Sequence, residues 1–454
     1  MKRIVLAALL AFAALSADAQ VVEHRVKWYE SLGSISSKYG VPVDTILNFN
    51  GLSAGDVKTR TVLQIPLWRN GSASDTEQGA DTLAITPGDV AVEEVAKISY
   101  SADNPLKASL VLPFRASGEQ PSSNYLDFYS GALVALAKMK GEGISVQLNV
   151  FDSEAYEGGV LFDNEVFLNS DIIIGPVMKQ ELVAYADFAR EHKIPIVSPM
   201  DQAAGDLAES NPYFFQVPVS GEQQLFNMAN SLYALENEKV MVFFDSSMKE
   251  QKYLDDVLNN LDSCGVTYGK YGYGLLSGRT LSESLIKVMS PDIRYKVVVA
   301  SEDDAFAPDI VRNMRVMKMF SVPVELYCSN RVRNFESIDS ETLYELSTHV
   351  HAPYFIDYGS EEVKNFLLKY RGLFNTEPTP FAFQGYDIFT FFISNLYALG
   401  SDFLEKVPEI SMELLQCNMQ FTREDEKSGW RNYATRDIIY NEDLTISVEK
   451  TVQD

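Results

Sequence analysis

From residue 107 onward, short apolar stretches alternate with longer amphipathic ones, and this alternation restricts the folds open to the chain. "KASLVLPF", "DIIIGPV" and "IPIVSP" have the length and apolar character of buried strands, and "ELVAYADFAREH" has the spacing of a helix. Strands alternating with helices predict βαβ units and parallel sheets, so the fold class is α/β. The later strands "KVMVFFD", "YKVVVAS" and "VPVELYCSN" are too many for one sheet, which favours two lobes.

The first helix of this series, "NYLDFYSGALVALAKMK", is amphipathic. Its apolar side chains recur at helical spacing. The residues predicted to share the inward face are Leu126, Tyr129, Leu133, Leu136 and Met139.

Residues 1–19 have the pattern of an export signal. A basic start precedes an apolar run from Ile4 to Leu15, and Ala17 and Ala19 fit the small-x-small pattern of cleavage. The run is shorter than the roughly 20 residues that span a bilayer as a helix. We expect a mature chain that begins near Gln20, does not span the membrane, and is periplasmic or secreted.

Residues 24–67 are predicted to form a small unit with the order strand, helix, helix, strand. Ser31 is placed to cap the first helix and Asp44 the second. In the second helix, Ile46, Leu47 and Phe49 are predicted to turn inward.

Residues 68–104 differ in composition from the segments on either side. They are rich in Gly, Ser, Asp, Glu and Ala and almost free of aromatic residues. Such a stretch cannot bury enough apolar surface to offset the entropy of ordering. It is predicted to be a flexible acidic linker to a larger body, residues 105–454.

The charge and the few cysteines and histidines exclude several functions. A net charge of −25 argues against nucleic acid as a partner. The three cysteines lie far apart with no metal-ligand spacing, and no cofactor is predicted. His349 and His351 would face the same side of a strand, but no third ligand is apparent, so both are predicted to be surface residues.

The small unit carries many residues at fixed spacings: Val26-Lys27, Glu30-Ser31-Leu32, Ile35, Tyr39-Gly40-Val41, Leu47, Asn50-Gly51-Leu52 and Leu63-Gln64-Ile65-Pro66. This series resembles the LysM family, which binds N-acetylglucosamine-containing glycans such as peptidoglycan and chitin. The resemblance implies a shallow groove between two loops. Its residues would be Tyr29, Glu30 and Ser31 on one side and Asn50, Gly51 and Leu52 on the other. Tyr29 replaces the family's usual glycine, so it could stack on a sugar or block the groove, and Ser31 and Asn50 could instead only cap and turn the fold.

The body also resembles a known family. "FYSGALVALAKMK", "IIIGPVMKQELVAYADFAREHKIPIVSP", "NPYFFQVPVSGEQQ" and "PTPFAFQGYDIFTFFISNL" are similar to segments of the type I periplasmic binding proteins, in particular the branched-chain amino-acid receptors. The resemblance implies a first lobe of about 105–217 and 352–415 and a second of about 218–351 and 416–454. The end of the chain is predicted to form a hairpin.

In that family a ligand lies between the lobes, at the carboxyl ends of the strands. The positions here that the resemblance assigns to this cleft are Arg115, Ser117, Met178, Lys179, Ser198, Met200, Ser246, Ser301, Glu302 and Ser329. Met178 and Lys179 stand where small hydroxyl residues are usual, and Asp201 would repel a ligand carboxylate. An ordinary amino-acid ligand is therefore not expected, and each of these residues could serve only its own loop.

No elbow, zinc or phosphate-loop motif of an enzyme occurs in the sequence. The favoured hypothesis is a non-catalytic cell-envelope protein that binds peptidoglycan and uses its body to bind a partner, such as a cell-wall enzyme. The alternative is a solute receptor for an amino acid, peptide or wall fragment that feeds a transporter. A cell-wall hydrolase is the third hypothesis and has the least support.

Overall fold

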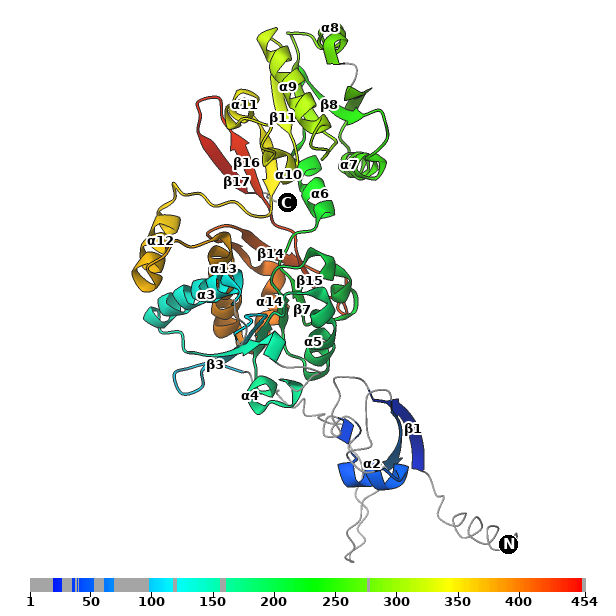
Figure 1. Cartoon of the computed structure of the whole chain (residues 1–454), viewed down its shortest axis with the longest axis vertical. Helices are drawn as coiled ribbons and strands as arrows, with labels where there is room; N and C mark the ends of the chain where they lie inside the picture. Colours follow the sequence, from blue (N-terminus) through cyan, green and yellow to red (C-terminus); the bar gives the residue numbers. More distant parts are fainter. Residues whose placement is uncertain are drawn as a thin grey trace, which may run out of the picture. The chain divides into compact units, whose positions relative to one another are not determined.

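The computed structural model divides into two compact units, residues 1–97 with 153–170 and residues 98–152 with 171–454. Figure 1 shows the chain coloured along its sequence. The described residues are 19–26, 35–36, 39, 41–52, 61–68, 98–116, 121–155, 161–275 and 278–450. No helix within these ranges is long and apolar enough to cross a membrane.

In the first unit, two antiparallel strands and a helix enclose a small core. β1 (Ala19–Arg25) pairs with β2 (Val62–Trp68), and α2 (Val43–Asn50) packs against β2. The buried core residues are Val26, Ile35, Val41, Ile46, Leu63 and Ile65. These elements agree with the predicted second helix and closing strand.

Two details of α2 differ from the prediction. The helix begins after Pro42, which is the N-cap residue, so Asp44 lies inside the first turn rather than at the cap. Phe49 is 47% exposed because Ile46 already fills the core beneath this short helix. The predicted cap Ser31 lies outside the described residues.

The first lobe of the body is built on an eight-stranded sheet in the order β13-β14-β15-β7-β6-β5-β3-β4. β13 and β14 are the antiparallel members, and the pairs from β15 to β4 are parallel. The strands are β3 (Leu106–Leu112), β4 (Val146–Asp152), β5 (Ile172–Ile174), β6 (Ile196–Ser198), β7 (Phe214–Gln216), β13 (Ser411–Glu413), β14 (Asn418–Thr422) and β15 (Trp430–Asn432). The central strands β3, β5, β6 and β7 are almost wholly buried, which explains their continuous apolar runs.

The second lobe has a seven-stranded sheet in the order β17-β16-β12-β11-β10-β8-β9. Its strands are parallel from β12 to β9, and the hairpin β16–β17 is antiparallel. The strands are β8 (Glu238–Asp245), β9 (Tyr268–Tyr273), β10 (Arg294–Val299), β11 (Val324–Tyr327), β12 (His349–Ala352), β16 (Arg436–Tyr440) and β17 (Ile446–Lys450). The predicted two-lobed α/β fold with largely parallel sheets and a terminal hairpin is confirmed.

Helices cover both sheets. Those of the first lobe are α3 (Ser123–Gly141), α5 (Lys179–His192), α12 (Glu361–Phe374), α13 (Pro380–Leu399) and α14 (Phe403–Lys406). Those of the second are α6 (Gly221–Ser231), α7 (Gln251–Ser263), α8 (Gly278–Val288), α9 (Phe306–Met319), α10 (Asn330–Arg333) and α11 (Ser340–Glu345). A further short helix, α4 (Glu165–Leu168), belongs to the first compact unit.

The chain passes between the lobes at three places, and the third differs from the prediction. The first two crossovers join β7 to α6 and β12 to α12, close to the predicted boundaries. The third was predicted near residue 416, yet β14 and β15 still belong to the first sheet. The crossing therefore lies between Asn432 and Arg436, because β15 pairs in parallel with β7 before the chain leaves.

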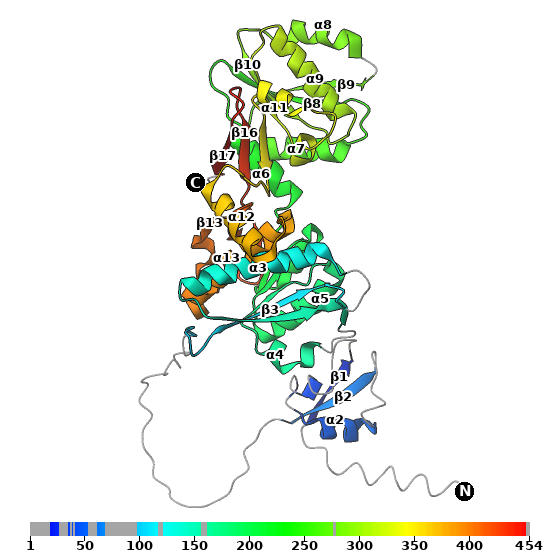
Figure 2. The ribbon, with the colours of Figure 1, turned by 60° about the vertical axis from the view of Figure 1, so that its left-hand side comes forward.

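Helices α3 and α13 lie side by side on one face of the first sheet (Figure 2). Two glycines allow their backbones to come close. A Cβ at Gly131 would lie 1.8 Å from the carbonyl oxygen of Ala382, and one at Gly385 would lie 2.0 Å from that of Phe128. This contact sets the buried face of α3, so Leu126 is 42% exposed, contrary to the prediction.

We predict that Gly131→Ala destabilises the body by about 1–3 kcal/mol, because the added methyl group meets backbone atoms that cannot move without separating the helices. The control is Gly141→Ala at the end of the same helix, where a Cβ has no atom within 4 Å. That change should raise stability by up to about 1 kcal/mol. Urea unfolding measures both, and equal effects would contradict the close-packing argument.

Candidate functional site

The loop after α2 is one half of the predicted glycan groove. Gly51 has a φ of 65° and ends the helix in the left-handed conformation, with its N–H donating to the carbonyl oxygen of Asn48 (3.3 Å). Leu52 is half-buried against the core of the unit. Tyr29, Glu30 and Ser31, the other half of the groove, lie outside the described residues.

Asn50 has a structural role. Its Nδ2 donates to the carbonyl oxygens of Ile46 and Gln64, at 2.8 Å each, and its Oδ1 accepts the N–H of Gln64 at 2.7 Å. The side-chain amide therefore joins α2 to β2 and is fully occupied.

The predicted cleft residues of the body follow the carboxyl ends of the strands, as expected. Arg115 follows β3, Met178 and Lys179 follow β5, and Met200 follows β6. Ser246, Ser301 with Glu302, and Ser329 follow β8, β10 and β11 in the second lobe. Ser117 is outside the described residues, and Ser198 is the last residue of β6 with no exposed surface.

In the first lobe, the carboxylates of Asp152 and Asp201 accept hydrogen bonds from backbone N–H groups of these loops. Asp152 accepts the N–H of Ala116 at 2.8 Å and that of Arg115 at 3.4 Å. Asp201 accepts the N–H of Lys179, the first residue of α5, at 2.8 Å, and the N–H of Ala203 at 2.8 Å. An internal carboxylate thus caps the helix that would otherwise offer free amides to an anion.

The Lys179 ammonium is engaged as well. It forms an ion pair with Asp206 at 2.8 Å, and this pairing is the main cause of the lowered pKa of Asp206. Met178 is 50% exposed beside it, and Met200 packs against the core of the lobe. These three side chains therefore serve the surface and core of their own lobe.

In the second lobe, Glu250 accepts hydrogen bonds from the loop after β10, as Asp152 and Asp201 do from loops of the first lobe. Its carboxylate accepts the hydroxyl of Ser301, which is fully buried, and the N–H of Glu302 at 3.0 Å. Ser329 caps α10 by accepting the N–H of Val332 at 3.3 Å. The amide of Ser246 donates to the carbonyl oxygen of Tyr273 at 2.9 Å.

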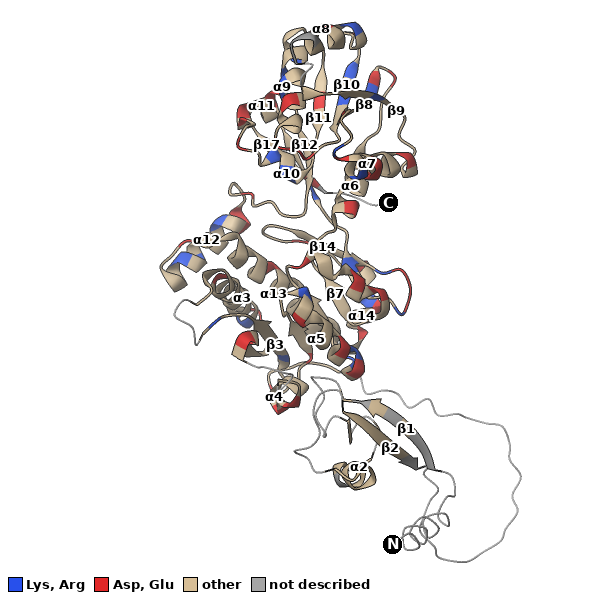
Figure 3. Cartoon of the chain, turned by 45° about the vertical axis from the view of Figure 1, so that its right-hand side comes forward, with Lys and Arg blue, Asp and Glu red and all other residues tan. Residues whose placement is uncertain are grey.

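These contacts decide the electrostatics of the strand ends. A charge-assisted hydrogen bond to a carboxylate is stronger than a neutral one, so an incoming carboxylate would compete with Asp152, Asp201 and Glu250 for the donors that these residues hold. It would also approach like charges, and acidic residues recur over both lobes (Figure 3). The arrangement does not suit the carboxylate of a free amino acid.

A buried carboxylate organises the last crossover region. Asp387 of α13 accepts the N–H groups of Leu415 (2.8 Å), Gln416 (2.9 Å) and Cys417 (3.2 Å). Burial raises the pKa of Asp387 to about 6, although these hydrogen bonds and Arg436 act in the opposite direction. The carboxyl group is held by the segment between β13 and β14.

Arg436, the first residue of β16, completes this arrangement. Its guanidinium donates to the carbonyl oxygens of Leu414, Leu415, Cys417 and Phe355. Arg436 of the second lobe is therefore hydrogen-bonded to the backbone of the second crossover. It is also bonded to residues 414–417, the segment that Asp387 binds. We call Asp387, Arg436 and residues 414–417 the crossover clamp.

Two cavities of the body lie away from the predicted cleft residues. One, of about 410 Å³, is lined by polar side chains including Gln202, Gln216, Gln223 and Arg431. The other, of about 880 Å³, lies along α12, α13, the crossover clamp and β17. Neither is lined by any of the ten residues that the resemblance assigned to the cleft.

The prediction that His349 and His351 are surface residues is wrong. β12 lies inside its sheet, so His351 is buried and His349 half-buried. His349 Nδ1 lies 3.4 Å from Asp437 Oδ2, and His351 Nε2 lies 2.9 Å from the hydroxyl of Ser231. Burial lowers the pKa of His351. Within the described ranges, no three His, Cys, Asp or Glu side chains are placed to hold a metal.

Sequence reasoning missed the roles of Asp152, Glu250 and Arg436. Asp152 and Glu250 each lie beside a strand end or helix start, which is where a capping carboxylate is common. That signal does not reveal that they bond loops 36 and 51 residues away. Asp387 lies in the segment "PTPFAFQGYDIFTFFISNL", but the sequence pattern does not reveal that its side chain is buried.

The chain combines a LysM domain with a two-lobed body whose fold is like that of type I periplasmic binding proteins. Residues 24–66 match the sequence model of the LysM domain family. No curated protein sequence matches the chain.

Solved structures resemble the body. A protein described as a branched-chain amino acid ABC transporter from Rhodospirillum rubrum aligns with a TM-score of 0.52 and 13% identity, over 76% of this chain and 100% of that chain. A branched-chain amino acid ABC transporter periplasmic ligand-binding protein from Burkholderia xenovorans LB400 gives 0.48 and 12%, over 76% and 94%. Full-length LpoA from Haemophilus influenzae gives 0.48 and 14%, over 78% and 60%. At such identities, the first of these shows the fold of the body.

We predict that Glu250→Ala lowers the free energy of unfolding by about 1–3 kcal/mol, because the buried Ser301 hydroxyl and the Glu302 amide lose their acceptor. The matched control is Asp304→Ala in the same loop, where the side chain is exposed. It should change stability by less than about 0.5 kcal/mol. Urea unfolding of both variants checks this, and equal losses would show that Glu250 holds no loop in place.

Proposed function

We propose that this chain is a non-catalytic cell-envelope protein whose LysM domain binds peptidoglycan and whose body binds a protein partner. The LysM match at residues 24–66 supports the first half of the proposal. The export signal expected at residues 1–19 would deliver the chain to the periplasm or the cell wall, where both ligands are present. A cell-wall enzyme is the class of partner that fits this location.

The occupied strand ends carry the second half of the proposal. Asp152, Asp201 and Glu250 already bond the backbone amides and the Ser301 hydroxyl at positions where an amino-acid receptor would hold its ligand. A binding-protein fold without a suitable site for an amino acid can still present two lobes to a macromolecule. The linker expected at residues 68–104 would let the body search while the LysM domain stays bound.

We predict that the mature chain sediments with insoluble peptidoglycan and that a chain lacking residues 20–97 stays in the supernatant. Cellulose serves as the matched control, since it is an insoluble glycan without acetamido groups. The LysM domain should discriminate against it. Equal pelleting of the shortened chain would place glycan binding in the body, and failure of both chains to pellet would remove the anchoring role.

A solute receptor that feeds a transporter is the second candidate function. The polar cavity of about 410 Å³ favours it, because Gln202, Gln216, Gln223 and Arg431 offer amide and guanidinium groups to a neutral polar solute. In this alternative, a peptide or wall fragment, rather than a free amino acid, is the ligand.

We predict that millimolar leucine leaves the unfolding temperature of the full chain unchanged. A receptor at 100 times its dissociation constant would gain about 2.7 kcal/mol of stability. Thermal unfolding with leucine, and with glycine as a control of the same charge, measures this. A rise with leucine alone would support the receptor and contradict the argument from the occupied strand ends.

A further inference from the structure

The outer strand of the second sheet, β17, has an unusual edge. β17 is the last strand in the order β17-β16-β12-β11-β10-β8-β9, so among the described residues one of its sides has no neighbouring strand (Figure 1). Ile446 and Val448 alternate along β17 and are each 38% exposed, and Leu444, 66% exposed, lies in the turn before the strand. An exposed edge strand with a row of apolar residues is a template for pairing with another chain.

The other edges of the two sheets lack such a row within the described residues. β13 has only three residues, and β9 carries Lys270 between Gly269 and Gly272. β4 carries Gln147 and Asn149, with Val150 as its exposed large apolar residue. Short length, a lysine and polar side chains are the usual protections of an edge. β17 also carries Ser447, Glu449 and Lys450, but it adds two exposed apolar side chains, Ile446 and Val448, at alternate positions.

The free edge of β17 presents backbone donors and acceptors. The N–H of Asn441 points toward β17 and donates to Thr445, whereas the N–H of Tyr440 points the other way, to Thr348 before β12. Directions alternate along antiparallel strands, and Tyr440 is opposite Ile446 while Ile438 is opposite Val448. The N–H and C=O groups of Ile446 and Val448 therefore point outward.

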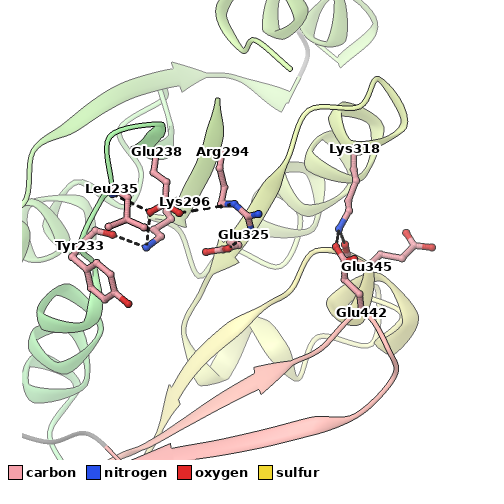
Figure 4. A network of polar contacts seen from close by, with 9 residues as sticks. All are labelled: Tyr233, Leu235, Glu238, Arg294, Lys296, Lys318, Glu325, Glu345 and Glu442. Carbon is pink, nitrogen blue, oxygen red and sulfur yellow. Dashed lines mark hydrogen bonds and ion pairs between the residues drawn. The ribbon is translucent and has the colours of Figure 1, made fainter. Parts of the chain in front are cut away.

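Contacts within the chain fix the position of the β16–β17 hairpin. Lys318, at the end of α9, donates to Glu442 in the hairpin turn and to the carbonyl oxygen of Glu345 (Figure 4). Within the turn, the Asn441 side chain donates to Ser447 at 2.8 Å. On the core side, Ile438 and Tyr440 of β16 are buried. A fixed edge loses little entropy on binding.

The space beside this edge is open and acidic. Val448 and Glu449 line the cavity of about 880 Å³ that continues along α12. The other acidic side chains that line it are Glu142, Asp357, Glu362 and Glu413, and the basic ones are Lys138, Lys369 and Arg436, so acidic groups are in excess. Lys138 lies 4.0 Å from Glu142, and the Arg436 guanidinium donates to backbone carbonyl oxygens. An extended segment that enters this groove would meet apolar contacts along β17 and negative charge around it.

We propose that the outer edge of β17 is the docking site for an extended, basic segment of a protein partner, which joins the second sheet as its next strand. Alternate apolar side chains of that segment would cover Ile446 and Val448, and its lysines or arginines would face Glu449 and the acidic groove. This proposal rests on the proposed function, in which the body binds a protein.

A second copy of this chain fits the edge less well. Pairing two β17 strands would bring together two hairpins that each carry Glu442, Asp443 and Glu449. Like charges on facing strands are destabilising, and each chain has a net charge of −25. A basic segment turns the same charges into attraction.

The test uses the full mature chain and a labelled, end-blocked peptide of alternating lysine and valine, seven residues long by design. The same peptide with alternate backbone amides methylated keeps its charge but cannot pair as a strand. Val448→Lys adds a positive charge to the edge, and Val150→Lys on β4 is the matched control, because both valines lie on edge strands with similar exposure. Fluorescence anisotropy measures binding, and Ile446→Lys replaces Val448→Lys if that variant does not fold.

We expect the unmodified peptide to bind the wild type, the methylated peptide to bind at least about tenfold more weakly, and Val448→Lys to lose about tenfold in affinity. Val150→Lys should bind as the wild type does. The proposal is overturned by no binding to the wild type, by equal binding of the methylated peptide, or by equal effects of the two lysine variants. A wild-type dimer in sedimentation that Val448→Lys dissolves would assign the edge to a second copy.

Peptidoglycan sedimentation of the same proteins separates this proposal from the proposed function. Suppose that the wild type does not bind the peptide, sediments with peptidoglycan and is not stabilised by leucine. The docking proposal is then rejected, and the proposed function stands. If the wild type binds the peptide but is stabilised by leucine, the docking proposal stands and the proposed function is rejected.

Discussion

The crossover clamp is the interaction on which the arrangement of the body depends. Asp387 sits on α13, in the core of the first lobe, and accepts three backbone N–H groups from residues 415–417. Arg436 starts the hairpin of the second lobe and donates to carbonyl oxygens of the same segment. Removing either side chain leaves backbone N–H or C=O groups of this segment without their partners, at a cost of about 1–3 kcal/mol for each buried group. The clamp thus joins the two lobes through backbone groups, and it fixes where β16 and β17 begin.

The same use of carboxylates supports the proposal that the body is not an amino-acid receptor. Asp152, Asp201 and Glu250 each satisfy donors of a loop at the carboxyl end of a strand, so the protein supplies the anions that a ligand would otherwise bring. The loops are stabilised without a ligand, and the fold becomes available for contacts on its outside. The free edge of β17 and the groove beside α12 are such an outside surface, and they lie next to the crossover clamp.

Sequence patterns predicted the elements well and the side-chain partners poorly. The apolar runs around Ile172–Ile174 and Ile196–Ser198 identified buried parallel strands, and the fixed spacings of residues 24–66 identified the LysM domain. The inward face of α3 was misplaced at Leu126, because the buried face instead runs through Phe128, Gly131 and Ala135, where α3 meets α13. The lobe boundary near residue 416 was misplaced because the pairing of β15 with β7 is a contact across more than 200 residues.

The sequence by itself determined the α/β class, the two-part organisation and the positions of many strand ends, since these follow from local periodicity and turn residues. β9 (Tyr268–Tyr273) was not among the predicted strands. Only the tertiary structure decided which polar groups at those ends remain free. The sequence pattern placed Ser301 and Lys179 at strand ends. It did not show that Glu250 accepts the Ser301 hydroxyl or that Asp201 accepts the Lys179 N–H, because these partners lie elsewhere in the chain. The exposed edge of β17 was also undecided, because a strand's place in a sheet depends on its neighbours. Hydrogen-bond partners and sheet order are long-range properties, and a local pattern does not contain them.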